Sequence, residues 1–415
     1  MSKKAVIISS IASNQGKTLL TAALLSHFKK DVRAFKIGPD FIDPIFHEKI
    51  TKRASINLDI YICSKEGVKW LFEKYAKNFS IIEGVMGYYD GMDKNSSAYD
   101  ISKLLNIPVI LVLDASGSYI TLSAVIKGMR EFKKDNLIKG VVLNRVSSKS
   151  HYEMIKREIK RHFNDIEILG WIKKDLLSIN SRYLGLDLRD INKIESLSNK
   201  VLENIDIDKI YAISNSDFSV SKSFSENRRI DKKAAIVKDR FFSFLYQDNV
   251  EYLRELFREV VFVSAEKDEM IPKDCDFIFL PGGYVESDEA YEVLKKSKNF
   301  QNSLKEAVKN KSAIYAECAG LLYLSNRVDD KKMSSILDMD FTLTKKRVRL
   351  GYYYINGIKG HAFHYSKPIN PKKGEILYKE GLNRGEVGAW REGRVYATYL
   401  HTMFRFNKEI IWNLL

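Results

Sequence analysis

The sequence predicts an α/β protein built from two doubly wound domains. Short apolar runs of strand length alternate with helix-length amphipathic segments, first over residues 1 to about 190 and again from about residue 234. This alternation is typical of βαβ units, in which helices cover both faces of a parallel sheet. A polar, serine-rich stretch separates the two patterns, and the 415 residues suffice for two or three domains with cores of their own.

The first domain, residues 1–195, is expected to contain a parallel sheet. Ligands bind at the carboxyl ends of the strands in such sheets, so the residues that follow each strand are the candidates for function. The expected strands are Ala5–Ser9, Val32–Ile37, Ser80–Glu83, Val109–Asp114, Gly140–Asn144 and Ile166–Trp171.

The first of these strands leads through a polar turn into Gly16-Lys17-Thr18 at the start of a helix. Gly16 lets the backbone approach an anion, Lys17 can reach the β- and γ-phosphates of a nucleotide, and the Thr18 hydroxyl can hold Mg²⁺. The full phosphate-loop motif has a glycine where this chain has Ile11, so the match is partial. The order strand, turn, helix nevertheless favours nucleotide binding.

Acidic and amide side chains follow other strands of the same sheet. Asp40 and Asp43 come after the second strand, and Glu83 ends the third just before a glycine-rich turn. An acid in Glu83's position is typical of the second Mg²⁺ contact of phosphate-loop proteins. Turn capping is the alternative for Asp40 and Asp43. Asn144 ends its strand with an amide that could read an adenine edge, or simply cap the strand.

Residues 196–232 are expected to be a linker, because periodicity is lost there and Ser214–Arg229 is polar and serine-rich. The second domain, residues 233–415, begins with the strand Ala234–Val237. A later strand runs into Cys318 among small residues, which resembles a nucleophile elbow at which the helix dipole lowers the thiol pKa.

Cys318 and His401 form a candidate nucleophile and base. His401 follows a late strand-like run, and the N–H groups of Ala319 and of the Gly282-Gly283 turn could stabilise an oxyanion. A cysteine alone is more often a buried core residue. The combination with the Pro-Gly-Gly turn and the histidine favours catalysis.

Composition excludes several classes of protein. The formal net charge of +15 is spread along the chain as lysine, which favours anionic small substrates over nucleic acid. Three widely spaced cysteines exclude a disulfide framework and a cysteine-rich zinc site. The longest apolar run, residues 107–113, is too short to cross a membrane, and the N-terminus has no signal-peptide pattern, so we expect a cytoplasmic protein.

Six stretches of the chain point together to one family. They are Gly16–Thr18, Phe35–Pro44, Asn57–Asp59, Glu83–Gly91, Leu280–Tyr284 and Ala316–Cys318. In this order, from near residue 1 to about residue 405, the chain resembles the cobyrinate a,c-diamide synthases of cobalamin biosynthesis.

The resemblance implies an amidotransferase with two active sites. An N-terminal phosphate-loop domain similar to dethiobiotin synthetase would use ATP and Mg²⁺ to activate the a and c acetate carboxylates of cobyrinate as acyl phosphates. A C-terminal class I glutaminase domain with a flavodoxin-like sheet would release ammonia from L-glutamine.

The resemblance also assigns roles to residues. In the glutaminase domain, Cys318 would be the nucleophile and His401 its base, with Gly283 and Ala319 forming the oxyanion hole. ATP would be bound by Gly16, Lys17, Thr18 and Asn144, and the metal by Thr18, Glu83, Asp43 and Asp40. Phe41, Tyr88 and Asp90 would lie near the corrinoid.

Some positions depart from the family pattern. Ser10 and Ile11 stand where relatives are richer in glycine and threonine. Many class I glutaminases have an acid two residues after the catalytic histidine, where this chain has Met403, so the site is expected to work as a dyad or to recruit an orienting residue from elsewhere. His361 and His364 would point to opposite faces of a strand, which disfavours a metal site.

Two alternatives stay open at this point. Hydrogenobyrinate or nickel-sirohydrochlorin could replace cobyrinate as the substrate of the same chemistry. A regulatory ATPase with an inactive glutaminase module is the alternative from another class, but its extra lysine in the phosphate loop is missing between Ser10 and Gln15. A homodimer, the order of the two amidations and the ammonia route are also left open.

Overall fold

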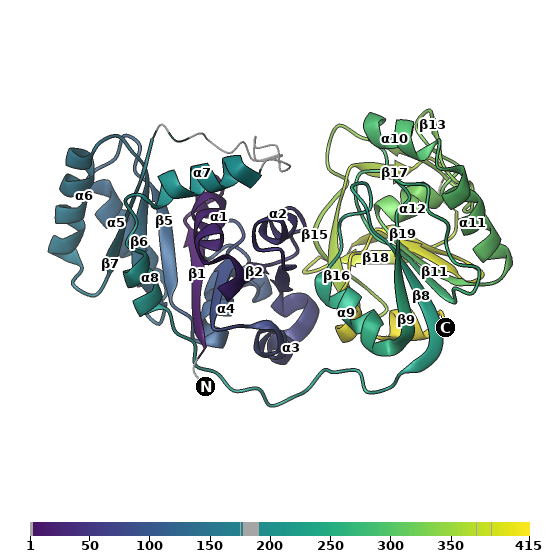
Figure 1. The fold of residues 1–415 in the computed structure, drawn as a ribbon, viewed down its shortest axis with the longest axis horizontal. Helices are drawn as coiled ribbons and strands as arrows, with labels where there is room; N and C mark the ends of the chain where they lie inside the picture. Colours follow the sequence, from purple (N-terminus) through teal and green to yellow (C-terminus); the bar gives the residue numbers. More distant parts are fainter. Residues whose placement is uncertain (1–2, 175, 177–190, 371, 383) are drawn as a thin grey trace. The chain divides into compact units, whose positions relative to one another are not determined.

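The computed structural model describes residues 3–174, 176, 191–370, 372–382 and 384–415, without the side chains of 191–194. The chain forms two compact units, Met1–Ser223 and Phe224–Leu415, which we describe separately (Figure 1). Their boundary falls inside the expected linker, residues 196–232. The linker prediction was too long, because the end of helix α7 and the whole of helix α8 occupy its first part.

Within the described residues, the first unit contains a parallel sheet of seven strands in the order β3-β2-β4-β1-β5-β6-β7 (Figure 1). The six predicted strands are present. The seventh, β3, has only three residues and escaped a search for longer apolar runs. The strands are β1 Lys4–Ser10, β2 Val32–Ile37, β3 Ile56–Leu58, β4 Phe79–Glu83, β5 Val109–Asp114, β6 Ile138–Val146 and β7 Glu167–Lys173.

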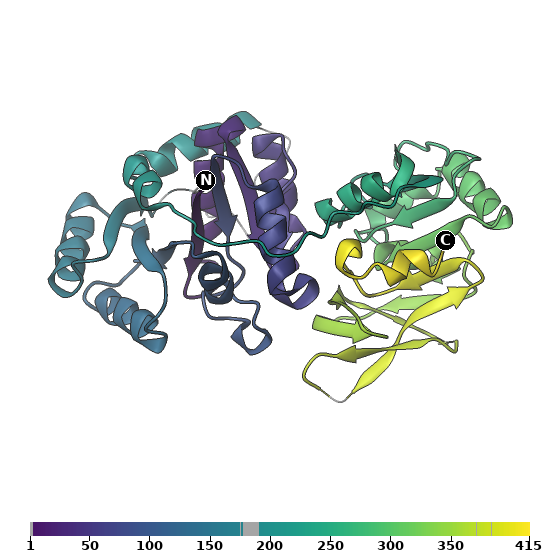
Figure 2. The same ribbon diagram turned by 90° about the horizontal axis from the view of Figure 1, so that it is seen from below.

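Helices cover both faces of this sheet (Figure 2). Apolar side chains of α1, α7 and α8 pack with Val6 and Ile8 on one face. On the other face, Phe72 of α3 contacts Phe35, and Tyr152 of α6 stacks on Trp171. The helices are α1 Lys17–Phe28, α2 Ile42–Thr51, α3 Ile60–Tyr75, α4 Ala98–Leu105, α5 Thr121–Phe132, α6 Lys149–His162, α7 Ile191–Leu202 and α8 Ile207–Ile213, with 3₁₀ turns at Lys29–Asp31 and Met92–Lys94.

The second unit contains a mixed sheet with the order β16-β15-β18-β19-β20-β11-β10-β8-β9 in the described part of the chain. Strands β20, β11, β10, β8 and β9 are parallel, as the predicted doubly wound fold requires. The antiparallel extension was not foreseen. The strands are β8 Ile230–Val237, β9 Phe257–Val263, β10 Phe277–Leu280, β11 Ala313–Glu317, β15 Arg349–Ile355, β16 Ile358–His364, β18 Glu375–Lys379, β19 Gly385–Glu392 and β20 Val395–Thr398.

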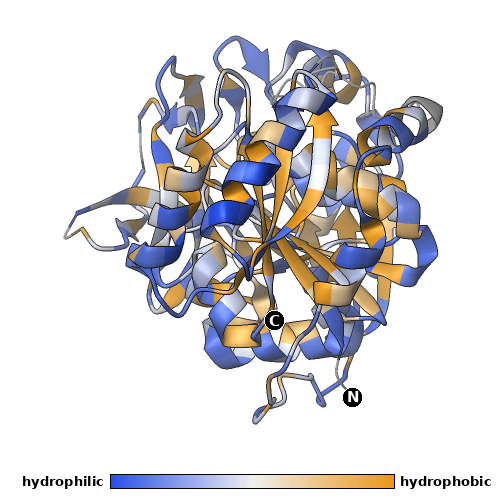
Figure 3. Cartoon of the chain, turned by 90° about the vertical axis from the view of Figure 1, so that its left-hand side faces the viewer, coloured by the Kyte–Doolittle hydropathy of each residue, from blue (hydrophilic) through white to orange (hydrophobic). Residues whose placement is uncertain are grey.

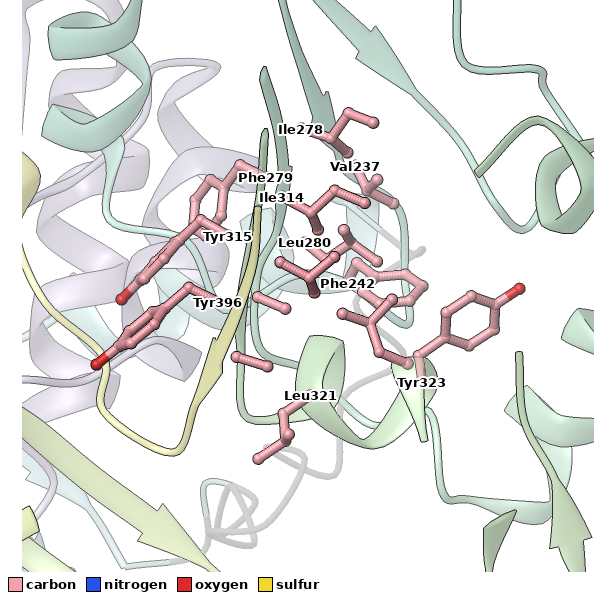
Figure 4. Close-up of a cluster of buried hydrophobic side chains, with 14 of the residues drawn as sticks. Val237, Phe242, Ile278, Phe279, Leu280, Ile314, Tyr315, Leu321, Tyr323 and Tyr396 are labelled. Carbon is pink, nitrogen blue, oxygen red and sulfur yellow. The ribbon is translucent and has the colours of Figure 1, made fainter. Parts of the chain in front are cut away.

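Apolar side chains from both sides of this sheet form the core of the second unit (Figure 4). Tyr315 of β11 and Tyr396 of β20 stack with ring centroids 6.0 Å apart. A smaller sheet and five helices complete the described part of this unit: β12 Arg327–Val328, β13 Lys331–Lys332, β14 Asp340–Leu343, β17 Ser366–Pro368, α9 Gln247–Leu256, α10 Asp288–Leu294, α11 Lys298–Lys309, α12 Ala319–Leu324 and α13 Glu409–Trp412, with a 3₁₀ turn at Phe404–Phe406.

In the first unit, which faces the viewer in Figure 3, the strands of the sheet are mostly hydrophobic, and helices that cover them carry both hydrophilic and hydrophobic residues. This is the pattern expected when a sheet is buried on both faces. Among the described residues, no helix combines the length and apolar character needed to span a bilayer.

Candidate active sites

The loop between β1 and α1 has the conformation that its glycine predicts. Gly16 has a φ of +102°, and a Cβ added there would lie 2.3 Å from Nδ2 of Asn144. The same Nδ2 donates a hydrogen bond of 2.8 Å to the carbonyl of Gln15. Asn144 therefore supports the phosphate loop from the neighbouring strand β6. Its contact with adenine stays a prediction.

Lys17 is buried at the start of α1, as the phosphate-loop motif predicts. Its Nζ donates to Oγ of Ser10 at 2.7 Å and to the carbonyls of Ala12 and Met86 at 3.0 Å and 2.6 Å. Burial and the nearby positive charge of Lys36 lower the pKa of Lys17 to about 8. The loop thus gathers a cation at the amino end of a helix, where an anion is favoured.

Glu83 ends β4 and is fully buried, and three side chains compensate its charge. Its oxygens accept from Oγ1 of Thr18 at 2.6 Å and lie 2.8 Å from Nε2 of His47. Nζ of Lys36 is 3.4 Å away. Burial alone would raise the pKa of Glu83, but Lys36, His47 and Thr18 outweigh it and hold that pKa well below its usual range.

Lys36 links the predicted acids and was missed as a site residue by sequence reasoning. It is buried in β2, bonds to the Asp43 carboxylate, and lies 3.6 Å from Asp40 and 3.4 Å from Glu83. These acids outweigh the effect of burial and raise the pKa of Lys36, so it stays charged. The available signal was a lysine inside an apolar strand, since a buried charge needs partners.

The predicted metal ligands divide into two groups. Thr18 and Glu83 meet directly, whereas Asp40 and Asp43 are paired with Lys36. Across the described ranges, no cluster of three or more His, Cys, Asp or Glu side chains is arranged to hold a metal ion. Mg²⁺ commonly takes one or two protein ligands and completes its shell with phosphate and water. Thr18 and Glu83 fit that requirement.

In the second unit, Cys318 lies at a sharp turn between β11 and α12. Its φ is +46°, which a non-glycine residue rarely adopts, and its N–H donates to the carbonyl of Thr398 at 2.8 Å. A Cβ at Gly320 would be 2.3 Å from the carbonyl of Leu280, so the turn needs a small residue there. This geometry confirms the predicted strand-to-helix elbow.

His401 follows β20, the strand that pairs with β11, and it has a buried carboxylate partner. Its Nδ1 lies 3.0 Å from Oε2 of Glu317, and Oε1 of Glu317 accepts from the N–H of Thr402 at 3.3 Å. Glu317 and His401 are 1% and 2% exposed. The orienting residue therefore comes from the position just before Cys318. Sequence reasoning left this residue unidentified, because nothing in the spacing of positions 317 and 401 indicates contact.

The turn after β10 borders the same imidazole. A Cβ at Gly282 would lie 2.4 Å from Cε1 of His401, and one at Gly283 would lie 1.8 Å from the carbonyl of Phe241. Both positions thus require glycine. Ala319 opens α12, and the first N–H groups of a helix have no partner within it. These observations are compatible with an oxyanion hole at Gly283 and Ala319, which stays a prediction.

Comparison with known proteins identifies the family. Residues 233–409 match the model of the CobB/CobQ-like glutamine amidotransferase domain, and residues 51–181 match an AAA domain model. Three relatives are each named cobyrinate a,c-diamide synthase. The protein of Fusobacterium nucleatum is 37% identical to this chain, and the match covers 97% of each chain. The protein of Saccharolobus solfataricus is 35% identical, with 97% of this chain and 98% of the relative covered. The protein of Clostridium tetani is 34% identical, with 99% of each chain covered.

The chain belongs to the cobyrinate a,c-diamide synthase family. The predicted family and the two-domain α/β fold are thereby confirmed.

One prediction about the thiol of this family member was wrong. We expected the helix dipole to lower the pKa of Cys318. Instead, burial and the negative charges of Glu286 and Glu317 raise the pKa of that thiol above its usual range. Helix α12 has only six residues, so its dipole is weak beside the cost of a buried thiolate. Cys318 is a thiol until a base removes its proton.

Tyr88, one of the three residues expected near the substrate of the family, lies in the core of the first unit. Its side chain is fully buried, its hydroxyl is 3.1 Å from Oγ of Ser102, and its ring packs against Tyr89 and Tyr99. It is a core residue, and the prediction of a substrate contact was wrong. Asp90 is exposed and accepts from the N–H of Gly87 at 2.7 Å, while Phe41 is half-buried at the start of α2. Their substrate contacts stay predictions.

Proposed function

We propose that this protein is an ATP-dependent, glutamine-hydrolysing ligase that amidates the a and c acetate carboxylates of cobyrinate in cobalamin biosynthesis. The observation that carries the proposal is the coexistence of two sites in one chain. A nucleotide-type loop with the buried Lys17, together with the buried Lys36 of strand β2, lies in the first unit, and a thiol elbow with an imidazole and a carboxylate lies in the second. The name shared by the relatives supplies the substrate.

In the proposed glutaminase reaction, Cys318 attacks the side-chain amide carbon of L-glutamine. His401 accepts the thiol proton and later returns a proton to the departing ammonia, and water then hydrolyses the thioester to release L-glutamate and the Cys318 thiol. The buried Glu317 carboxylate fixes the imidazole and stabilises its charged form. The N–H groups of Gly283 and Ala319 would donate to the oxyanion. The raised thiol pKa supports this scheme, because a neutral thiol needs a base when the amide is in place.

In the proposed synthetase reaction, ATP phosphorylates the substrate carboxylate, and ammonia then displaces phosphate from the acyl phosphate. Gly16, Lys17 and Thr18 would bind the ATP phosphates, and Lys36 would add a second positive charge at the same sheet edge. Thr18 and Glu83 would hold Mg²⁺, which would supply positive charge to the phosphoryl group that is transferred. We assign this half-reaction to the first unit, which contains the predicted domain 1–195 and also the rest of α7 and α8, and the glutaminase to residues 233–415 of the second unit.

The decisive measurement is the mass of the product formed from ATP, L-glutamine and a tetrapyrrole. With cobyrinate we expect the mass change of two amidations. Hydrogenobyrinate and nickel-sirohydrochlorin are tested in parallel, and faster turnover of either would replace cobyrinate in the proposal. Absence of amidation with all three would refute the ligase function.

Substitutions in each unit test the two proposed sites independently. Cys318→Ala is expected to abolish glutamine-dependent amidation and to leave ammonia-dependent amidation largely intact, whereas Cys275→Ala, another buried cysteine of the same unit, leaves both. Lys17→Ala is expected to abolish amidation from either nitrogen source, and Lys29→Ala, at the far end of α1, is its control. Loss of ammonia-dependent activity in Cys318→Ala would contradict two separable sites.

A further inference from the structure

A half-buried glutamate on the loop that also carries Gly283 has no role in the chemistry described above. Glu286 lies in the loop between β10 and α10, three residues after Gly283. In the part of the chain that the structure describes, its Oε2 is shut off from solvent and has no hydrogen-bond partner. A buried carboxylate oxygen without a donor is costly, so its presence calls for an explanation.

The surroundings of Glu286 connect it with the thiol site. Its charge is close enough to help raise the pKa of both Cys318 and Tyr399. The charge of Lys331 acts to lower the pKa of Glu286, but Nζ of Lys331 is paired with Asp288 at 3.0 Å. Glu286 follows the turn whose Gly282 lies against His401, and among the described residues it has no ion-pair partner of its own.

The loop that presents Glu286 is held firmly on both sides. Before it, the N–H of Tyr284 donates to the carbonyl of Phe241 at 3.0 Å, and the N–H of Phe244 donates to the carbonyl of Gly282 at 2.9 Å. After it, Ser287 caps α10 by accepting from the N–H of Ala290 at 3.2 Å. The carboxylate is thus pre-positioned, which lowers the entropic cost of binding a cation.

We propose that Glu286 binds the α-ammonium group of L-glutamine. This inference rests on the proposed glutaminase function and specifies how its substrate is recognised. The ammonium is the only cationic group of glutamine, and four bonds of about 1.5 Å separate it from the amide carbon that Cys318 attacks, so it reaches about 5 Å from that carbon. A carboxylate on the loop that carries Gly283 and borders His401 can accept from the ammonium while the amide lies at the thiol.

This role makes Glu286 a specificity-determining residue. Amides without an α-ammonium group would leave the carboxylate unpaired and would be poor substrates, since a site built around a charged hydrogen bond rejects analogues that lack the donor. Glutaramate, which is glutamine without its α-amino group, is the matched probe.

The test compares Glu286→Gln with the wild-type protein on both amides. We expect kcat/KM for L-glutamine to fall by about 10- to 100-fold, mainly through KM, because a charge-assisted hydrogen bond is lost. The value for glutaramate should change by less than about threefold, and ammonia-dependent amidation should not change. Glu289→Gln, an exposed carboxylate three residues further on, is the control. An equal fall for both amides, or an unchanged KM for glutamine, would overturn the inference.

Binding is measured separately, so that failure of the glutaminase function can be recognised. Cys318→Ala protein is titrated calorimetrically with L-glutamine, alone and combined with Glu286→Gln. If Cys318→Ala binds glutamine equally tightly with and without Glu286→Gln, this inference alone is refuted. If the wild-type protein neither binds nor hydrolyses glutamine, the proposed function is refuted as well. Folding of Glu286→Gln is judged by its thermal transition, and Glu286→Asp, which has a shorter side chain, is used if that variant does not fold. Wild-type affinity for glutamine and wild-type discrimination against glutaramate in Glu286→Asp would contradict the proposal.

Discussion

Replacing Glu317 with glutamine tests how the thiol site works. Glu317 lies at the end of β11, immediately before the nucleophile, and its Oε2 is 3.0 Å from Nδ1 of His401. Glutamine keeps the size of the side chain but removes its charge. If its amide nitrogen turns toward His401, the imidazole must carry its proton on Nε2, which is the wrong tautomer for a base acting on Cys318.

The expected loss follows from the burial of this pair. A hydrogen bond to a charged group contributes about 1.5–3 kcal/mol, which corresponds to about 10- to 100-fold in rate. Since Glu317 and His401 are almost fully buried, water cannot replace the lost partner. A change of tautomer adds to this loss, and the analogous substitution in a serine protease costs about 10⁴-fold. We therefore expect the kcat of glutamine hydrolysis to fall by about 10²- to 10⁴-fold.

The assay is release of glutamate from L-glutamine, with ammonia-dependent amidation measured on the same preparation. Only the first should fall in Glu317→Gln. Glu306→Gln, which changes an exposed carboxylate on α11, serves as the control and should leave both rates unchanged. Glutamine hydrolysis within about threefold of wild type in Glu317→Gln would refute the orienting role of this carboxylate.

Three further predictions concern the first unit. Because the pKa of Lys17 is lowered to about 8, its ammonium loses its proton as the pH rises through that value. The affinity for ATP, measured by titration, should therefore weaken between pH 7 and 9.5, and a constant affinity would contradict this prediction. Lys36→Met removes the cation paired with Asp43 and one of the partners of the buried Glu83. We expect a loss of about 3–5 kcal/mol and a melting temperature, measured by calorimetry, that is lower by about 6–20 °C, whereas Lys52→Met on the surface should not change it. Gly16→Ala places a methyl group on Asn144 at a positive φ, so ATP binding should drop at least about tenfold while the fold is retained, and unchanged binding would show that the loop is free to rearrange.

Local features of the sequence predicted much of the fold and part of both sites. The phosphate loop and the Cys318 elbow are each formed by a few consecutive residues, so their geometry follows from the strand before them, the helix after them and the small residues between. The parallel sheets were predicted from the alternation of apolar runs with helix-length segments, which is also a pattern of consecutive residues. The antiparallel strands β15, β16, β18 and β19 were missed, because the sequences of the parallel strands do not indicate that further strands extend the sheet at its edge.

Only the tertiary structure decided which side chains meet. The pairing of Lys36 and His47 with Glu83 joins three elements, and Glu317 meets His401 across 84 positions of sequence because β11 pairs with β20. It also decided that Tyr88 is core and that the pKa of the Cys318 thiol is raised, since burial and neighbouring charge depend on the whole surroundings of a group. The sequence by itself thus determined the kinds of chemical groups and the strands that deliver them, while their partners and ionisation states were determined by packing.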